Sequence, residues 1–398
     1  MKIKSKIHSL QKEIISLRRD FHQYPELGWK EFRTSEKIVN YLKGIDVEIE
    51  RIAYPGVVAI LRGKKPGATL LMRSDMDALP IQEENDIPYK SLHPGLMHAC
   101  GHDGHMAILL VVAKILSEYK DAINGNIKFV FQPDEESAEG AKKMIEEGIL
   151  ENPKVNASIG LHLWSHLQTG FIGLKTGAIM ASLSTFKVKI IGRGGHTGYP
   201  EAAIDPIIAA ANIIQQVQTI QTREMSRLNP LIIMFGKVSG GTANNIIPDT
   251  VEMEGTLRFL NQGGERETIN PNKRFIELIH SIAKCHRVKV EIQVKEKNKM
   301  VINEPDMVQI IRSSAKHVLG KNNIIDFSCT ASEDFSEFSH CVPSVFYFLG
   351  CTPLGQKNYV SHHNCFFDID ENALALGVEI QVRSALEYFN HSHFIENN

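Results

Sequence analysis

Residues 127–163 read IKFVFQPDEESAEGAKKMIEEGILENPKVNASIGLHL, and this segment identifies the fold class. It holds an apolar run at 127–131, a helical pattern at 138–150 and a second apolar run at 157–163. Short runs of apolar residues without polar alternation are typical of strands that are buried on both faces. Because a helix between two such strands forms the crossover of a parallel sheet, the segment predicts an α/β fold with a mostly parallel sheet covered by helices.

The same alternation continues on both sides of this segment. Ile7, Leu10, Ile14, Leu17 and Phe21 recur at helical spacing, and Pro25 follows them, which predicts that the first element is an amphipathic surface helix. Further strands are expected at 57–61, 69–72 and 344–349, and further helices at 104–119, 306–319 and 371–388.

The periodicity changes near residue 183. Phe186, Val188 and Ile190 alternate with polar residues, which indicates a sheet with one solvated face. Expected elements then follow at 205–222, 232–238, 251–259, 268–286 and 288–294. This order predicts an inserted α+β domain of β-α-β-β-α-β type. We therefore expect a catalytic domain at 1–182 and 299–398 and an inserted domain at 183–298.

Length and composition exclude several classes of protein. The chain has 398 residues, more than the roughly 250–300 that one hydrophobic core serves, and 43% of them are hydrophobic. Lys plus Arg (44) nearly balances Asp plus Glu (46), so no overall field attracts nucleic acid or anionic lipid. No apolar run approaches the ~18 residues of a membrane span, and residues 1–20 lack the apolar core of a signal peptide. A cytoplasmic protein without membrane or nucleic-acid partners is expected.

The densest group of metal-ligand residue types lies at 97–105, which reads MHACGHDGH. Thiol and imidazole side chains are the ligands that borderline transition metals prefer. Cys100 and His102 are the stronger ligand candidates. We expect structural roles for His98, as a surface residue, and for His105, at the start of a helix. The six cysteines form no C-x-x-C pair, so a disulfide framework is not expected.

Carboxylates follow two of the expected strands. Asp134, Glu135 and Glu136 come directly after the apolar run 127–131, and their mutual repulsion would be relieved by bound cations. Neighbours in an extended chain point to opposite sides, so Glu135 and Glu136 can divide their work between a metal and a water. Asp75 and Asp77 follow the run 69–72 in the same way. The alternatives are an acidic helix start and an Asp-rich turn.

Isolated histidines complete the candidate set. His162 ends the run 157–163 and could equally be a core residue, and His363 lies in the sequence Ser-His-His-Asn at 361–364. The motifs H-E-x-x-H, G-x-S-x-G and the P-loop are absent. The glycine-rich stretch at 192–197 is a poor dinucleotide turn because Thr197 occupies the third glycine position.

Several motifs together resemble the hippurate hydrolase, or N-acyl-amino-acid amidohydrolase, branch of the metallo-aminoacylase family. They are HQYPELG at 22–28, DMDALP at 75–80, CGHDGH at 100–105, FQPDEE at 131–136, GRGGH at 192–196, NIIPD at 245–249 and SEDF at 332–335. The resemblance covers nearly the whole chain. It implies a two-metal hydrolase whose inserted domain is a lid that also dimerises.

The resemblance also implies residue roles. The metal ligands fall on Cys100, His102, Glu136, His162 and His363, the last chosen over His362 because of its spacing to the acidic pair Asp370-Glu371. The general base falls on Glu135, and Asp77 falls on the carboxylate that orients a ligand or the water. His196 falls on the donor to the developing oxyanion, with a surface residue as the alternative. Arg258 and Asn245 fall on the donors to a substrate carboxylate, and for Arg258 a salt bridge is the alternative.

The expected reaction is hydrolysis of an N-acyl amino acid, hippurate-like or N-acetylated, to a carboxylic acid and a free amino acid. We expect two divalent metal ions per subunit, with Mn²⁺ favoured over Zn²⁺ or Co²⁺ because carboxylate and imidazole ligands outnumber the thiolate. A homodimer or a higher homo-oligomer is expected. The alternatives are a dipeptidase or carboxypeptidase of the same wider family and a non-catalytic metal- or ligand-binding protein. A redox protein is disfavoured because Cys100 has no resolving cysteine near it in the sequence.

Overall fold

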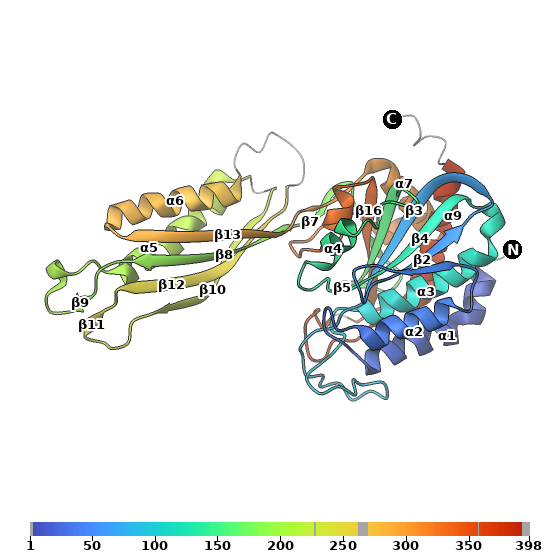
Figure 1. Ribbon diagram of the computed structural model, residues 1–398, viewed down its shortest axis with the longest axis horizontal. Coiled ribbons are helices and arrows are strands. Elements are labelled where there is room, and N and C mark those ends of the chain that lie inside the picture. The colour runs from blue at the N-terminus through green and yellow to red at the C-terminus, as the bar shows by residue number, and fades with distance from the viewer. Residues whose placement is uncertain (1–2, 227, 262–269, 357, 392–398) are drawn as a thin grey trace. The chain divides into compact units, whose positions relative to one another are not determined.

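The computed structural model describes residues 3–226, 228–261, 270–356 and 358–391. The chain forms two compact units, which confirms the predicted two-domain α/β class (Figure 1). Unit 1 comprises Met1–Ile179, Ile302–Ser328 and Glu333–Asn398, and unit 2 comprises Met180–Val301 and Cys329–Ser332. Among the described residues, no helix is long and apolar enough to cross a membrane.

Unit 1 is built on a large sheet with strand order β1-β2-β4-β3-β5-β16-β6-β15. Its central neighbours β4, β3, β5 and β16 run parallel, whereas β1–β2, β2–β4 and β16–β6 are antiparallel. The strands are β1 (Glu48–Arg51), β2 (Val57–Arg62), β3 (Lys65–Asp75), β4 (Asn124–Gln132), β5 (Ala157–Gln168), β6 (Ile172–Gly173), β15 (Ile324–Ile325) and β16 (Ser344–Thr352). β16 is buried along its whole length, as expected for a strand covered on both faces.

Helices cover this sheet on both faces. On one face, α3 packs against α1 and α9, and α9 packs against α7. Leu70 and Met72 of β3 belong to the apolar core on this face, whereas Arg73 takes part in a polar network with Gln132 of β4. The helices are α1 (Ile3–Gln23), α2 (Phe32–Leu42), α3 (His102–Glu118), α4 (Gly140–Glu146), α7 (Pro305–Leu319), α8 (Ser336–Ser339) and α9 (Asn372–His391). Short 3₁₀ turns cover Lys120–Ala122 and Lys321–Asn323.

Unit 2 has an antiparallel sheet of order β10-β12-β8-β13, with α5 and α6 along one side of it (Figure 1). Phe186, Val188 and Ile190 of β8 join the apolar core with these helices, while the intervening Lys187 is exposed. The chain order β8-α5-β10-β12-α6-β13 matches the predicted pattern. The elements are β8 (Ser182–Ile191), β9 (Gly195–His196), α5 (Pro206–Thr219), β10 (Leu231–Gly240), β11 (Ile246–Ile247), β12 (Thr250–Phe259), α6 (Pro271–His286) and β13 (Lys289–Asn298). A 3₁₀ turn covers Pro200–Ala202, a π-helical turn covers Ile220–Glu224, and β7 (Gly177–Met180) pairs with β14 (Val301–Asn303).

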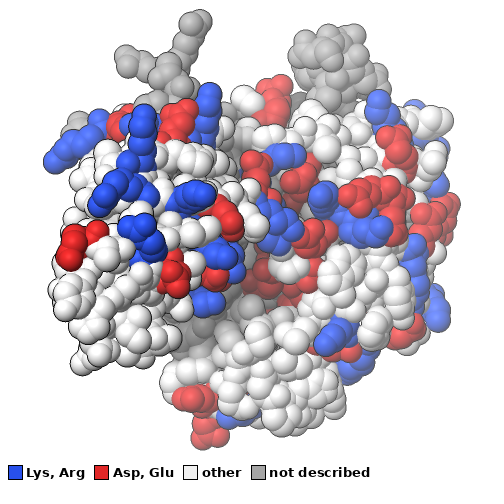
Figure 2. Space-filling model, turned by 60° about the vertical axis from the view of Figure 1, so that its left-hand side comes forward, with Lys and Arg blue, Asp and Glu red and all other residues white. Residues whose placement is uncertain are grey.

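The surface carries both signs of charge. Figure 2 shows both acidic and basic side chains on the face in view. This distribution agrees with the formal net charge of −2.

Candidate metal centre and active site

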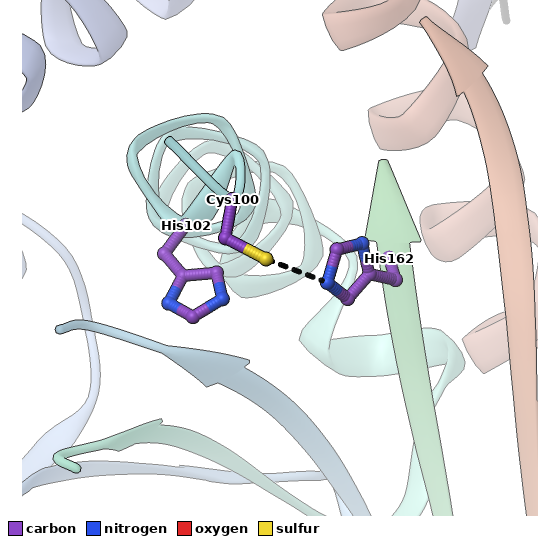
Figure 3. Close-up of side chains that lie close together, drawn as sticks. All are labelled: Cys100, His102 and His162. Carbon is purple, nitrogen blue, oxygen red and sulfur yellow. Dashed lines mark hydrogen bonds between the residues drawn. The ribbon is translucent and has the colours of Figure 1, made fainter. Parts of the chain in front are cut away.

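The candidate site lies in unit 1, where β3, β4 and β5 run parallel and α3 begins. Cys100 precedes the helix, His102 is its first residue, and Gly101 between them adopts φ 88°. Only glycine adopts this left-handed conformation without strain, so Gly101 allows the chain to present two adjacent donors before the helix starts. His162 comes from β5, and its Nε2 lies 3.6 Å from Cys100 Sγ (Figure 3).

The five predicted metal ligands come together. The donor atoms of Cys100, His102 and His162 lie within 4.8 Å of one another, and so do those of Cys100, Glu136 and His363. Nε2 of His363 lies 3.2 Å from a carboxylate oxygen of Glu136. A third group joins His102 to Glu135 and Glu136. Because these groups overlap, they form two adjacent candidate metal positions that share ligands.

The ring orientations of the histidines suit metal binding. Nδ1 of His102 donates to the backbone carbonyl of Asp77 at 2.9 Å, and Nδ1 of His162 donates to the carbonyl of Leu163 at 2.7 Å. In the neutral form of each ring, Nε2 therefore keeps a lone pair that faces the cluster, as is usual for metal-binding histidines. Nε2 of His102 is buried and has no hydrogen-bond partner among the described residues. A divalent cation would satisfy it, so the donor set fits a metal.

The electrostatics of the cluster also favour a bound cation. Burial alone would lower the pKa of His102, but the carboxylates of Asp75 and Asp77 outweigh burial and raise this pKa to about 10. Burial and the nearby carboxylates of Glu136 and Glu135 raise the pKa of the Cys100 thiol well above its usual value. A divalent ion reverses this balance, because it favours the thiolate and the carboxylates over their protonated forms.

Glu135 and Asp77 both lie beside the candidate ligands. Glu135 is buried, and burial together with the carboxylates of Glu333 and Glu136 raises its pKa well above the usual value. Oδ2 of Asp77 accepts the backbone N–H of Glu136 at 2.9 Å, while the carbonyl of the same residue holds His102. Asp77 therefore orients two of the candidate ligands.

The neighbouring histidines are engaged elsewhere. Nδ1 of His105 lies 2.7 Å from Asp75, and its Nε2 accepts the N–H of Leu163 at 2.8 Å, so both nitrogens are occupied. His362 is held in the same way, by Ser165 and by the carbonyl of Leu163, which leaves His363 as the candidate ligand. The expectation that His98 lies at the surface is wrong: it is buried, because the loop before α3 passes through the interior.

Sequence reasoning missed a buried arginine behind the site. Arg73 donates to Gln132, Asp75, Glu333 and Asp334 at 2.7–2.9 Å. Its charge offsets carboxylates that would otherwise be buried without a counter-ion. The available signal was an arginine at the end of an apolar strand, beside Asp75. Its partners at 333 and 334 could not be read from spacing.

The other predicted residues belong to unit 2. His196 on β9 pairs with Ile246 on β11, which places it beside Asn245, and both are exposed. Arg258 is half-buried near the far end of β12, eight residues beyond Thr250, or roughly 27 Å at about 3.4 Å per residue. The structure therefore brings His196 and Asn245 together but does not bring Arg258 to them within one chain.

Arg258 has neutral partners only among the described residues. It donates to the carbonyl of Thr330 at 3.4 Å and to the hydroxyl of Ser332 at 3.3 Å. Within the described ranges, no carboxylate forms an ion pair with it. Burial lowers its pKa.

Comparison with known proteins places these features in context. The model of the peptidase family M20/M25/M40 matches residues 71–387. The chain is 38% identical over 370 residues to the N-acetyl-L-cysteine deacetylase of Bacillus subtilis, covering 92% of this chain and 86% of that protein. It is 35% identical over 397 residues to the thermostable carboxypeptidase 1 of Saccharolobus solfataricus, covering 98% of both.

A solved structure shows the same fold. The YXEP protein of Bacillus subtilis, described as a dinuclear metal-binding peptidase from the M20 family, superposes with a TM-score of 0.83 at 30% identity. The match covers 96% of this chain and 99% of that one.

Proposed function

The chain belongs to peptidase family M20/M25/M40, and from this membership we propose that it uses divalent metal ions to hydrolyse the amide bond of N-acyl amino acids. One observation carries the proposal. The five residues assigned as ligands converge, and beside them lies Glu135, a further buried carboxylate that is left over once those five hold the metal. A spare carboxylate is what a hydrolase needs as a general base, and a metal-binding protein without catalysis has no use for it.

We assign two divalent ions to Cys100, His102, Glu136, His162 and His363. Support comes from the overlapping donor groups and from the relative described as dinuclear. When bound, such ions supply Lewis acidity and lower the pKa of a water. Mn²⁺ is favoured over Zn²⁺ or Co²⁺ because only one of the five ligands is a thiolate.

Glu135 then performs the proton transfers. Its carboxylate takes a proton from the attacking water as the water oxygen bonds to the amide carbon. When the carbon–nitrogen bond breaks, Glu135 returns the proton to the leaving amine. The products are a carboxylic acid and a free amino acid. Asp77 keeps Glu136 and His102 in place during these steps.

Arg258 recognises the α-carboxylate of the substrate. A planar guanidinium can bind a carboxylate through two parallel hydrogen bonds, and the present partners of Arg258 are neutral and weakly held. A carboxylate ligand would also supply a counter-ion, which Arg258 does not have among the described residues.

His196 and Asn245 act on the active site of a partner subunit. Within one chain, they lie at the opposite end of the unit 2 sheet from Arg258. Their predicted roles agree with that of Arg258 if His196 and Asn245 come from a second copy of the chain. Exposed apolar side chains in the same unit suit such an interface: Tyr199 64%, Ile207 44%, Ile208 57% and Ile246 50%. In this proposal residues 183–298 form the lid and the dimerisation domain.

A carboxypeptidase or dipeptidase activity is the second candidate, because a relative that matches the chain over 98% of its length is named a carboxypeptidase. Both candidates use the same metal ligands and the same base. They differ in the acyl group of the amide bond that is cleaved. The question is whether this acyl group carries a free amine.

A turnover panel separates the two candidates. Metal-loaded protein is tested with acetyl- and benzoyl-amino acids and with dipeptides that end in the same amino acids. We expect higher kcat/KM for the acyl compounds. If the dipeptides are preferred, the second candidate is correct, and if no compound of either class is hydrolysed, the proposed function is wrong.

A further inference from the structure

The segment from Glu26 to Glu31, which leads into α2, contacts both turns that carry carboxylates of the site. The carbonyl of Glu26 accepts the N–H of Ala78 at 2.8 Å, next to Asp77. Oε1 of Glu31 accepts the N–H of Asp134 at 2.9 Å, at the start of the turn that presents Glu135 and Glu136. None of the catalytic or ligand roles assigned above explains this segment.

The turn that Glu31 contacts has an unfavourable backbone conformation. Asp134 has φ 53°, in the left-handed region that residues with a side chain rarely adopt. Such a conformation persists only where the surroundings enforce it. Two buried carboxylates hold the backbone N–H groups on either side of Glu135: Glu31 holds that of Asp134, and Asp77 holds that of Glu136.

The side chain of Glu31 accepts the Asp134 N–H and does not cap helix α2. Glu31 occupies the N-cap position of α2, yet it makes no capping hydrogen bond. Glu26 caps the helix instead, through the N–H groups of Arg33 and Thr34. Glu31 is fully buried, which is costly for a carboxyl group. Its contact with the Asp134 N–H therefore accounts for an acid at this position.

The close approach of the two segments also requires Gly28. A Cβ atom at position 28 would collide with the Asp134 side chain. Gly28 does not adopt a positive φ, so an alanine there is compatible with the local backbone and its effect would come from the collision.

We propose that Glu31 is a positioning residue: it holds the strained Asp134 turn and, through that turn, sets the geometry of Glu135 and Glu136. Gly28 makes room for the contact. Only the kinetic test of this inference rests on the proposed function. The second test, Mn²⁺ binding at Glu136, reports the same geometry and needs no substrate.

The test compares Glu31→Ala and Glu31→Gln with the wild-type protein. Mn²⁺ dissociation constants are measured by calorimetry, and kcat and KM are measured with the best substrate of the turnover panel. Glu31→Ala should weaken Mn²⁺ binding and lower kcat by about 10- to 100-fold, the usual range for a residue that supports a metal ligand, with KM unchanged. Glu31→Gln keeps a carbonyl acceptor for the Asp134 N–H and should retain most of both.

Glu304 provides a matched control. It is also a glutamate at a helix N-cap, and its side chain accepts the N–H of Met307 at 2.8 Å, but it starts α7 and contacts no residue of the site. Glu304→Ala should lower thermal stability and leave Mn²⁺ affinity and kcat unchanged.

Two results would overturn the inference: Glu31→Ala with wild-type Mn²⁺ affinity and kcat, or Glu31→Gln as impaired as Glu31→Ala. If Glu31→Ala does not fold, Gly28→Ala decides, because it displaces Asp134 while Glu31 stays. Gly28→Ala should weaken Mn²⁺ binding and lower kcat, and wild-type values for both would refute the role of the contact. If no substrate is hydrolysed, the proposed function fails, and the Mn²⁺ affinities still test this inference.

Discussion

Glu135 and Glu136 are adjacent in the chain but have different surroundings. Glu135 is buried among the carboxylates of Glu333 and Asp334, which together with burial raise its pKa well above the usual value, and a bound cation would favour its ionised form. Glu136 is half-buried, with His363 3.2 Å away and its N–H held by Asp77. This difference is the basis for assigning proton transfer to Glu135 and metal binding to Glu136.

Substitution of the two glutamates tests this division. Glu135→Gln should keep both metal ions and lose at least ~10²-fold in kcat, the usual scale of general acid–base catalysis. Glu136→Gln should lose metal as well as activity, because it removes an anionic ligand. Metal analysis and steady-state kinetics on both variants provide the measurement. Reversed phenotypes would show that the ligand and the base have been exchanged.

The predictability of single residues depended on their spacing in the chain. Cys100 and His102, and likewise Glu135 and Glu136, stand within a few residues of each other, so their chemistry was visible in the sequence. The partners of Arg73 could not be read in this way, because Glu333 lies 260 residues further along the chain. Glu31 was missed for the same reason, since Asp134 is 103 residues away.

Among the elements, the joint between the loop 97–101 and α3 carries two of the candidate ligands, Cys100 and His102. Gly101 lets Cys100 and His102 face the same cluster, and it needs a positive φ to do so. Helix α3 is buried over most of its length and anchors this joint against α1 and α9. A change of backbone at position 101 should therefore be transmitted to the metal ligands.

A pair of glycine substitutions tests the role of this joint. Gly101→Ala places a Cβ at φ 88°, which should destabilise the fold by about 1–2 kcal/mol and weaken metal binding on the order of tenfold. Gly148 has φ 89° and open space around it, and it lies outside the site. Gly148→Ala should show a similar loss in thermal unfolding with wild-type metal affinity. Equal metal affinity in the two variants would argue against the claim that the backbone at this joint positions the metal ligands.

Most elements could be predicted from periodicity, and the exceptions have physical causes. Strand β1 is an edge strand of sequence EIER whose side chains are largely exposed, so it has no apolar pattern to detect. The helix expected at 138–150 is only Gly140–Glu146, because Gly148 adopts a positive φ soon after it. Helix α2 was missed although Ile38, Val39 and Leu42 form a buried stripe.

At the scale of the whole molecule, unit 2 carries one group of predicted substrate donors at each end of its sheet. The change from continuous to alternating apolar residues near 183 made this unit predictable from the sequence. Its role in dimerisation stays a prediction from the family resemblance, and the exposed apolar side chains that suit an interface, such as Tyr199, are defined only by the fold. A two-fold dimer would let His196 and Asn245 of each chain serve the site of the other.

A subunit-mixing experiment tests the proposed assembly. Glu135→Gln and His196→Ala proteins, each inactive alone, are mixed under conditions that allow exchange. In the mixed dimer, the site that keeps Glu135 receives an intact His196 from its partner. Because random exchange makes about half of the dimers mixed, with one working site of two, roughly a quarter of wild-type activity should return. A mixture that stays inactive despite proven exchange would exclude action across the dimer.

The most direct test of the claim that the protein is a metal-dependent amidohydrolase is a titration of metal-free protein with Mn²⁺. Hydrolysis of an N-acyl amino acid is followed during the titration. We predict no turnover at the start and a rise in rate that levels off at two ions per chain, in keeping with the two candidate metal positions. Full turnover by protein shown by metal analysis to hold no metal, or saturated binding without hydrolysis of any N-acyl amino acid, would contradict this prediction.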